Sequence, residues 1–331
     1  SHSPTLPLSH SPTLPLSHSP TDHSALFTSP MTLAFIATGD IAIPTFLHLI
    51  EHGPKPCVLI TQPDKPVGRS QSSAVPPEIK TIAIAHGIPV WQPEKISEVA
   101  ADLEELRPDI AVVMAYGQII SKAVRKASKR AIINLHASIL PKYRGASCIQ
   151  SAIRDGETET GITIMHVIRE LDAGDIICKK IIPIGLQETG GELHDRLAAL
   201  GPSALAEALV ILSANPKAGA PQNPDEVTYS PKLLREHGRI DFTQPAEILE
   251  RTIRAYDPWP GTFSEVSIKG KSKRLKIFPP TFISDHPLQA GELLSLSGEL
   301  LIGCGNHSLV LSEVQPEGSK RMSAQAFANS L

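Results

Sequence analysis

Three residues that could transfer an acyl group to an amine lie in one stretch of the sequence. Asn134 and His136 end an apolar run, 131–133, that is typical of a buried strand, and strand alternation would put both side chains on one face. Asp172 follows on a glycine-containing loop that could bring a carboxylate to the same strand end. An amide can hold a carbonyl oxygen as it becomes an oxyanion, an imidazole can shuttle a proton, and a carboxylate can orient the imidazole. Together these residue types predict acyl transfer.

The elements that must position these residues alternate between strands and helices. Apolar runs predict strands at 33–37, 57–61, 88–91, 110–115 and 131–135, and later at 161–167 and 175–184. Helical patterns occur at 43–52, 78–86, 96–106, 122–128 and 190–212. This alternation predicts an α/β domain with a Rossmann-like, doubly wound parallel sheet. Ligands bind such sheets beyond the carboxyl ends of the strands, which is where Asn134 and His136 lie.

The C-terminal part has a different pattern. Residues 213–225 are rich in Ala, Pro, Gly and Asn, which indicates a linker. Short strands with turn signals follow from about residue 237, at 263–268, 275–277, 292–296, 300–303 and 309–314. They predict a small β-barrel. We therefore expect a catalytic domain at 31–212, a linker at 213–236 and a second domain at 237–331.

The first thirty residues repeat the octapeptide Ser-His-Ser-Pro-Thr-Leu-Pro-Leu. Frequent proline excludes a helix or a central strand, and the absence of Lys and Arg argues against a signal or transit peptide. We expect residues 1–30 to be a disordered extension and Met31 to be the biological start.

The bulk composition excludes several classes of protein. The 331 residues are 41% hydrophobic and 20% charged, as in a soluble globular protein of two domains. No apolar run reaches the length of a membrane span, so no membrane partner is expected. The four cysteines are scattered, which argues against a zinc site or disulfides and fits a reducing cytoplasm. The first strand-to-helix turn has one glycine, Gly39, so a dinucleotide is not indicated. No Gly-x-x-x-x-Gly-Lys-Ser/Thr string occurs, so ATP is not indicated either.

The net charge of −3 does not predict nucleic-acid binding, but the basic residues are unevenly distributed. One cluster could contact phosphate, although an ordinary solvated strand is an equal alternative. Its members are Lys269, Lys271, Lys273, Arg274 and Lys276.

Longer motifs surround the three candidate catalytic residues. The pattern Asn-x-His-x-Ser-x-Leu-Pro-x-x-Arg-Gly begins at Asn134, and Leu-Asp-Ala-Gly-Asp begins at Leu171. These motifs resemble the formyltransferases that use 10-formyltetrahydrofolate. The segments 61–69, 255–261 and 322–325 resemble the branch of that family that formylates methionyl-tRNA. The resemblance covers about residues 31–331.

The resemblance implies transfer of the formyl group of 10-formyltetrahydrofolate to the α-amine of methionyl-tRNA, without a metal. Asn134 would donate to the formyl oxygen, and His136 would stabilise that oxygen and pass a proton to the leaving nitrogen. Asp172 would favour the protonated imidazole and could take the amine proton. Asp175 is the rival carboxylate, but the motif favours Asp172. The folate donor would contact two segments, Met114, Ala115, Tyr116 and Gly117 in one and Ser138, Ile139, Leu140 and Pro141 in the other, with a core strand end as the alternative for the first.

The tRNA partner would be the initiator methionyl-tRNA, bound by a monomeric enzyme. Arg69 lies in the loop 62–77, which is too long for an ordinary connection and which resembles the family's acceptor-stem loop. Lys271, Lys273 and Arg274 would contact tRNA from an OB-like C-terminal domain. The serines that follow Arg69 depart from the lysines frequent in relatives.

Two residues near the catalytic motif have open roles. Arg144 could bind a substrate carboxylate or phosphate, or form a local ion pair. Cys148 stands where relatives usually have proline, and a small buried thiol is its default interpretation.

Three other activities compete with this prediction. An amino-sugar N-formyltransferase would share Asn134, His136 and Asp172, but the motifs at 61–69 and 258–261 argue against it. A glycinamide ribonucleotide formyltransferase would lack the C-terminal domain. A folate- or tRNA-binding module without catalysis is disfavoured by the intact set of three residues.

Overall fold

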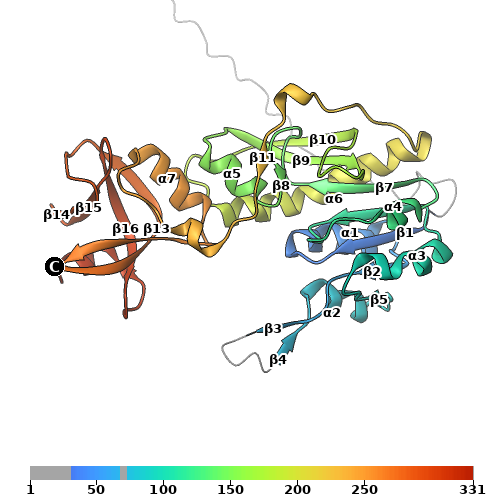
Figure 1. Ribbon diagram of the computed structural model, residues 1–331, viewed down its shortest axis with the longest axis horizontal. Coiled ribbons are helices and arrows are strands. Elements are labelled where there is room, and N and C mark those ends of the chain that lie inside the picture. Colours follow the sequence, from blue (N-terminus) through green and yellow to red (C-terminus); the bar gives the residue numbers. More distant parts are fainter. Residues whose placement is uncertain (1–30, 68–72, 331) are drawn as a thin grey trace, which may run out of the picture.

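A computed structural model describes residues 31–67 and 73–330 of the protein (Figure 1). The predictions for residues 1–30 and for Arg69 lie outside the described residues. Figure 1 shows a sheet covered by helices, followed along the chain by a smaller unit of antiparallel strands. The sheet carries the candidate catalytic residues.

Seven strands form the larger sheet in the order β10-β9-β7-β6-β1-β2-β5. Five of them are parallel neighbours, as predicted: β1 (Leu33–Ala37), β2 (Val58–Ile60), β5 (Val90–Trp91), β6 (Ile110–Met114) and β7 (Ala131–His136). The predicted α/β class is therefore confirmed. The last two strands, β9 (Glu159–His166) and β10 (Ile176–Pro183), extend the sheet as an antiparallel pair. Their short connection allows a hairpin but no crossover.

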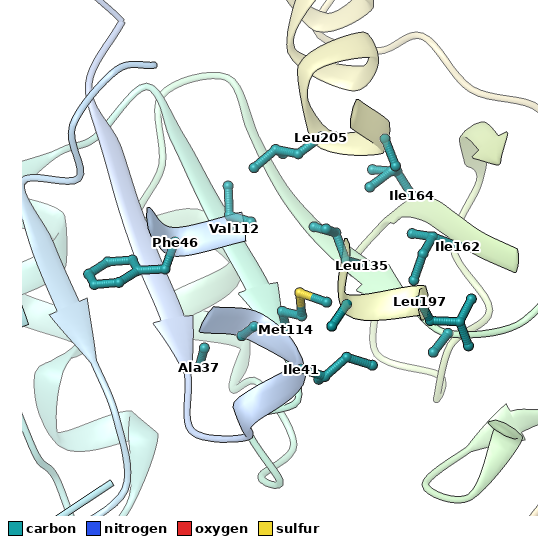
Figure 2. Close-up of a cluster of buried hydrophobic side chains, with 14 of the residues drawn as sticks. Ala37, Ile41, Phe46, Val112, Met114, Leu135, Ile162, Ile164, Leu197 and Leu205 are labelled. Carbon is teal, nitrogen blue, oxygen red and sulfur yellow. The ribbon is translucent and has the colours of Figure 1, made fainter. Parts of the chain in front are cut away.

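Helices cover both faces of this sheet, which explains its unbroken apolar strands. Leu33, Phe35 and Ala37 pack in one core with α1 (Ile43–His52) and α6 (Gly190–Ala214), whereas Ala34 and Ile36 pack in the other. The second core includes η3 (Ile96–Val99), α3 (Ala100–Leu106) and α4 (Lys122–Lys126). Figure 2 shows strand residues of the first core near side chains of α1 and α6. The remaining elements are η2 (Asp40–Ala42), α2 (Glu78–Ala85) and α5 (Cys148–Arg154).

Among the described residues, α6 is the one helix whose length and composition would allow it to cross a membrane. Its buried residues, from Leu193 to Leu212, belong to the core beneath the sheet. A methyl group on Gly201 would lie 2.3 Å from Oγ1 of Thr45 in α1, so glycine permits the close approach of the two helices. The packing identifies α6 as a core helix.

The smaller sheet has the strand order β12-β13-β16-β15-β14, and β17 pairs with β16. All pairs are antiparallel, and the strands have the following bounds: β12 (Thr262–Ile268), β13 (Lys271–Ser284), β14 (Leu293–Leu296), β15 (Glu299–Gly303), β16 (Ser308–Pro316) and β17 (Met322–Ser323). The predicted second β-domain is thus present as an antiparallel half-barrel. Two helices that the sequence analysis missed, α7 (Ala246–Ala255) and α8 (Ala324–Ala328), contribute to its core.

The segment between the two sheets is more ordered than a simple linker. It contains η4 (Pro224–Glu226), β11 (Tyr229–Ser230) and η5 (Arg235–Gly238). Strand β11 pairs in parallel with β8 (Arg144–Gly145), close to the candidate site. The segment 62–77, predicted as a long loop, contains the antiparallel strands β3 (Lys65–Val67) and β4 (Ser73–Val75). We retain the division at 212 and 237 as a proposal.

Candidate active site

The structure brings Asn134, His136 and Asp172 together at the end of β7. The amide nitrogen of Asn134 donates to Oδ1 of Asp172 at 3.4 Å, and Nδ1 of His136 lies 3.7 Å from Oδ2. The backbone N–H of Gly145 donates to the same Oδ2 at 2.8 Å. Asp172 lies on the loop between β9 and β10, and its carboxylate therefore faces both β7 and β8.

Both ring nitrogens of His136 face groups that favour the protonated ring. Nε2 lies 2.8 Å from the carbonyl oxygen of Tyr143, which can only accept, so Nε2 carries a hydrogen. Burial by itself lowers the pKa of His136, but the Cys148 thiol, the Asp172 carboxylate and the Tyr143 carbonyl outweigh it and raise the pKa to about 9. The imidazolium is therefore the favoured form at neutral pH.

Cys148 is the first residue of α5 and is buried, as expected of a small thiol in a core. It also interacts with His136 through its side chain. This interaction has no signature in the sequence, because the sequence does not place the start of α5 against β7.

Gly145, whose backbone N–H donates to Asp172, occupies a position that requires glycine. Its φ is +110°, and a methyl group there would lie 2.5 Å from the carbonyl oxygen of Ser230 in β11. Gly145 therefore allows β8 and β11 to approach closely while its N–H points at the carboxylate.

Three non-glycine residues with left-handed backbone lie at the carboxyl side of these strands. They are Ala115 with φ 47°, Tyr143 with φ 61° and Asp172 with φ 49°. Each such conformation costs of order 1–3 kcal/mol and persists only where the surroundings impose it. Strain of this kind concentrates at functional sites, and here it includes the carboxylate residue itself.

The first predicted folate segment is divided between the two cores. The side chains of Met114 and Tyr116 are 1% and 2% exposed, in opposite cores, while Ala115 and Gly117 are exposed. The carbonyl oxygen of Ala115 accepts hydrogen bonds from the N–H groups of Thr38 and Gly39. The alternative of a core strand end thus describes the two large side chains of this segment, Met114 and Tyr116, which are buried.

The second predicted folate segment is a tightly bonded loop. Ser138 and Leu140 are fully buried, Pro141 is buried and Ile139 is half-buried. Thr163 of β9 fixes the loop, because its hydroxyl donates to the carbonyl of Ser138 at 2.6 Å and accepts from the N–H of Leu140 at 3.2 Å. Residues 139–143 line a cavity of about 190 Å³, and Glu157 and Lys179 also line it.

Arg144 and Gln222 are a pair whose interaction the sequence analysis did not reveal. The Nε and Nη2 atoms of Arg144 donate to Oε1 of Gln222 at 3.1 and 2.7 Å. The two roles left open for Arg144 were binding of a substrate anion and a local ion pair. Its partner in the structure is instead a neutral amide. Asp175, the rival carboxylate, is exposed.

The predicted tRNA-binding residues of the second domain lie on the hairpin formed by β12 and β13. Lys269 and Gly270, with φ of 51° and 75°, form its two-residue turn. Lys271 and Lys273 are exposed opposite Ile268 and Val266. Arg274 is exposed as well, but its guanidinium covers the ring of Phe263 at 3.7 Å.

Within the described part of the chain, no group of three or more His, Cys, Asp or Glu side chains is placed to hold a metal ion.

Comparison with known families accounts for most of the chain. The family model described as formyl transferase matches residues 38–209, and that of the formyl transferase C-terminal domain matches residues 232–331. A methionyl-tRNA formyltransferase of Akkermansia muciniphila is 48% identical over 297 residues, which cover 88% of this chain and 94% of that protein. One of Geobacter metallireducens is 39% identical over 300 residues, with coverage of 90% and 94%.

Solved structures share the fold at lower sequence identity. An N-formyltransferase from Helicobacter canadensis, in complex with folinic acid and dTDP-3-aminofucose, has a TM-score of 0.64 at 20% identity and covers 85% of this chain and 98% of its own. HypX from Aquifex aeolicus, in complex with tetrahydrofolic acid, has a TM-score of 0.61 at 20% identity, with coverage of 90% and 47%. These two structures support the fold alone.

Proposed function

The chain belongs to the formyltransferase family, and we propose that Asn134, His136 and Asp172 carry out its chemistry. The enzyme transfers the formyl group of 10-formyltetrahydrofolate to the α-amine of methionyl-tRNA, which yields N-formylmethionyl-tRNA for translation initiation. The observation that carries the residue assignment is the approach of Asn134 and His136 to one carboxylate at the end of β7.

The geometry suggests a separate task for each side chain. Nδ1 of His136 lies too far from Asp172 for a hydrogen bond, so its proton is available to the formyl oxygen. Asn134 has a second amide hydrogen that can donate to the same oxygen as negative charge develops there. Oδ1 of Asp172, which accepts one long bond, can take the proton that the attacking amine loses.

The bonds and protons then balance. The amine nitrogen forms a bond to the formyl carbon, and the bond from that carbon to N10 of the folate breaks. Asp172 accepts the proton of the amine, and His136 supplies a proton to the leaving N10. Transfer of one proton between the two residues, directly or through water, restores the starting state.

For the folate donor, we assign direct contact to the proposed residues that keep exposed surface, Ala115, Gly117 and Ile139. The other five shape the backbone behind them: Met114, Tyr116, Ser138, Leu140 and Pro141.

For the tRNA, we propose two binding regions, the β3–β4 arm and the β12–β13 hairpin, with Arg69 in the sequence between β3 and β4. The base of the arm is held in place, because Asp64 bonds Lys80 at 2.8 Å and the Gln92 amide at 2.7 Å. Lys271 and Lys273 supply two exposed cations on the hairpin. We further propose that the enzyme acts on the initiator tRNA as a monomer, in the cytoplasm and without a membrane partner.

One experiment tests this function against the amino-sugar alternative. The protein is incubated with 10-formyltetrahydrofolate labelled in the formyl group and with initiator methionyl-tRNA, elongator methionyl-tRNA or a dTDP-amino sugar. We expect label on the initiator methionyl-tRNA, and none with the Asp172→Asn variant. Label on the sugar alone would replace the proposed acceptor, and full activity of the variant would refute the assignment of Asp172.

A further inference from the structure

The side chain of Gln222 uses all of its hydrogen-bonding groups at the edge of the candidate site. Its amide nitrogen donates to the carbonyl oxygen of Asp172 at 2.8 Å and to that of Gly174 at 2.9 Å, and lies 3.9 Å from the sulfur of Met165. Its oxygen accepts both bonds from Arg144. Carbonyl oxygens only accept and guanidinium groups only donate, so the orientation of this amide is determined.

We propose that Gln222 is a positioning residue for the carboxylate of Asp172 and that the segment around it is part of the active site. This inference rests on the proposed function, in which Asp172 takes the amine proton. Gln222 acts through the backbone of Asp172 and through Arg144.

The loop that Gln222 holds needs an external partner. Asp172 has left-handed backbone, and its own carbonyl oxygen points to the Gln222 amide. A conformation of this kind relaxes unless its neighbours prevent it. Because the carboxylate hangs from that backbone, relaxation would move both oxygens away from Asn134 and His136.

The chain around Gln222 is fixed on both sides, so its side chain can serve as a rigid support. On one side, Ala220 and Ile176 exchange two backbone hydrogen bonds at 2.8 and 2.9 Å. On the other side, Tyr229 and Ser230 pair with Arg144 and Gly145. The segment predicted as a linker thus lies along two of the loops that build the site.

Arg144 is the second group that Gln222 positions. Its bonds to Gln222 go to a neutral amide, so the guanidinium keeps its full charge. Arg144 also precedes Gly145, whose N–H bonds Asp172. The amide of Gln222 therefore acts on Asp172 in two ways. It bonds the carbonyl oxygen of Asp172 directly, and through Arg144 it fixes β8, whose Gly145 N–H donates to the Asp172 carboxylate.

Two variants of Gln222 and one control test the proposal. Gln222→Leu keeps the size of the side chain but removes the four bonds to carbonyls and Arg144. Gln222→Glu keeps an acceptor for Arg144 but replaces the amide nitrogen, which donates to two carbonyl oxygens, by a carboxylate oxygen that cannot donate to either. Gln315→Leu is the control, because Gln315 also donates to a backbone carbonyl, that of Ser319, but in an exposed part of the second domain.

The rate of a single turnover is measured across pH 5.5–10 for each protein, with KM for both substrates. We expect roughly ten- to hundredfold slower turnover for both Gln222 variants, since a displacement near 1 Å has effects of that size. KM should stay within about twofold, and the pH at which the rate changes should move, because a displaced Asp172 alters the pKa of His136. A purely structural role would not move the pH profile.

The outcomes separate this inference from the proposed function. Parental turnover and pH profile in both Gln222 variants would overturn the positioning role, and so would a change confined to KM for tRNA. If Gln222→Leu does not fold, Gln222→Glu gives the same decision. Loss of turnover in Gln315→Leu as well would mean that the effect is not specific to the site. An inactive parent, or a fully active Asp172→Asn variant, would instead contradict the function on which the inference rests.

Discussion

Replacing Asp172 by asparagine should convert His136 from a mostly protonated to a partly neutral side chain near pH 7. Asparagine keeps the size of the side chain and can still accept a hydrogen bond from Gly145, but it removes the negative charge 3.7 Å from Nδ1 of His136. In the parent the pKa of His136 is raised to about 9, since the Cys148 thiol, the Asp172 carboxylate and the Tyr143 carbonyl outweigh the effect of burial. Loss of the carboxylate must therefore lower this pKa.

The expected size of the effect follows from the geometry. The two side chains are only 8% and 12% exposed, so solvent screens their interaction weakly. An opposite charge at this distance shifts a pKa by roughly 1–3 units. The variant should therefore titrate between about pH 6 and 8, which is inside the range of an ordinary rate measurement.

The same shift predicts how stability depends on pH. His136 has a folded-state pKa above the unfolded value of 6.5, so its contribution to stability is complete below pH 6.5 and is lost as the pH rises through about 9. At 1.36 kcal/mol per unit, lowering this pKa by roughly 1–3 units should make the variant roughly 1.4–4 kcal/mol less stable than the parent near pH 6. The difference between parent and variant should shrink at pH 10.

Histidine NMR titration and urea melts at pH 6 and pH 10 measure both effects. The 13 histidines require assignment, which a His136→Gln variant supplies by the resonance it removes. A pKa that remains near 9 after Asp172→Asn, or a stability difference that is equal at both pH values, would refute the argument that the carboxylate controls the imidazole.

The sequence predicted the parts of the fold that depend on local pattern. The parallel strands appear as unbroken apolar runs, because their two faces are buried in separate cores. Asn134 and His136 could be placed at a strand end because alternation follows directly from backbone geometry. Alternation alone would put Met114 and Tyr116 on one face, but β6 ends at Met114 and Ala115 has left-handed backbone, so the two side chains enter opposite cores.

The remaining features depend on interactions between distant segments. Gln222 lies 50 positions from Asp172 and bonds a backbone carbonyl, for which no residue pattern exists. The antiparallel addition of β9 and β10 depends on where the chain returns to the sheet. The helix α7 is different, because Ala246, Leu249 and Ile253 have helical spacing that turn signals nearby obscured.

Three further changes test other parts of the site and the tRNA surface. Cys148→Ala should lower the pKa of His136 in the same NMR titration, and an unchanged pKa would leave Asp172 as the controlling group. Gly145→Ala should lower the free energy of unfolding in urea by roughly 1–3 kcal/mol and slow turnover at least tenfold, since it strains a backbone at φ +110°; normal melts and rates would contradict this. Replacing Lys271 and Lys273 by Gln should weaken tRNA binding at low salt and reduce the slope of log affinity against log salt by roughly 0.9 for each phosphate that the variant no longer neutralises. Arg274→Gln should reduce the slope less, because its guanidinium packs on the ring of Phe263 and Glu265 lies opposite Arg274 in β12. The folate KM and the melting temperature of the lysine variant should match those of the parent, since both lysines are exposed. An unchanged slope in the double variant would mean that the hairpin is solvated surface, and tRNA recognition would then depend on the β3–β4 arm.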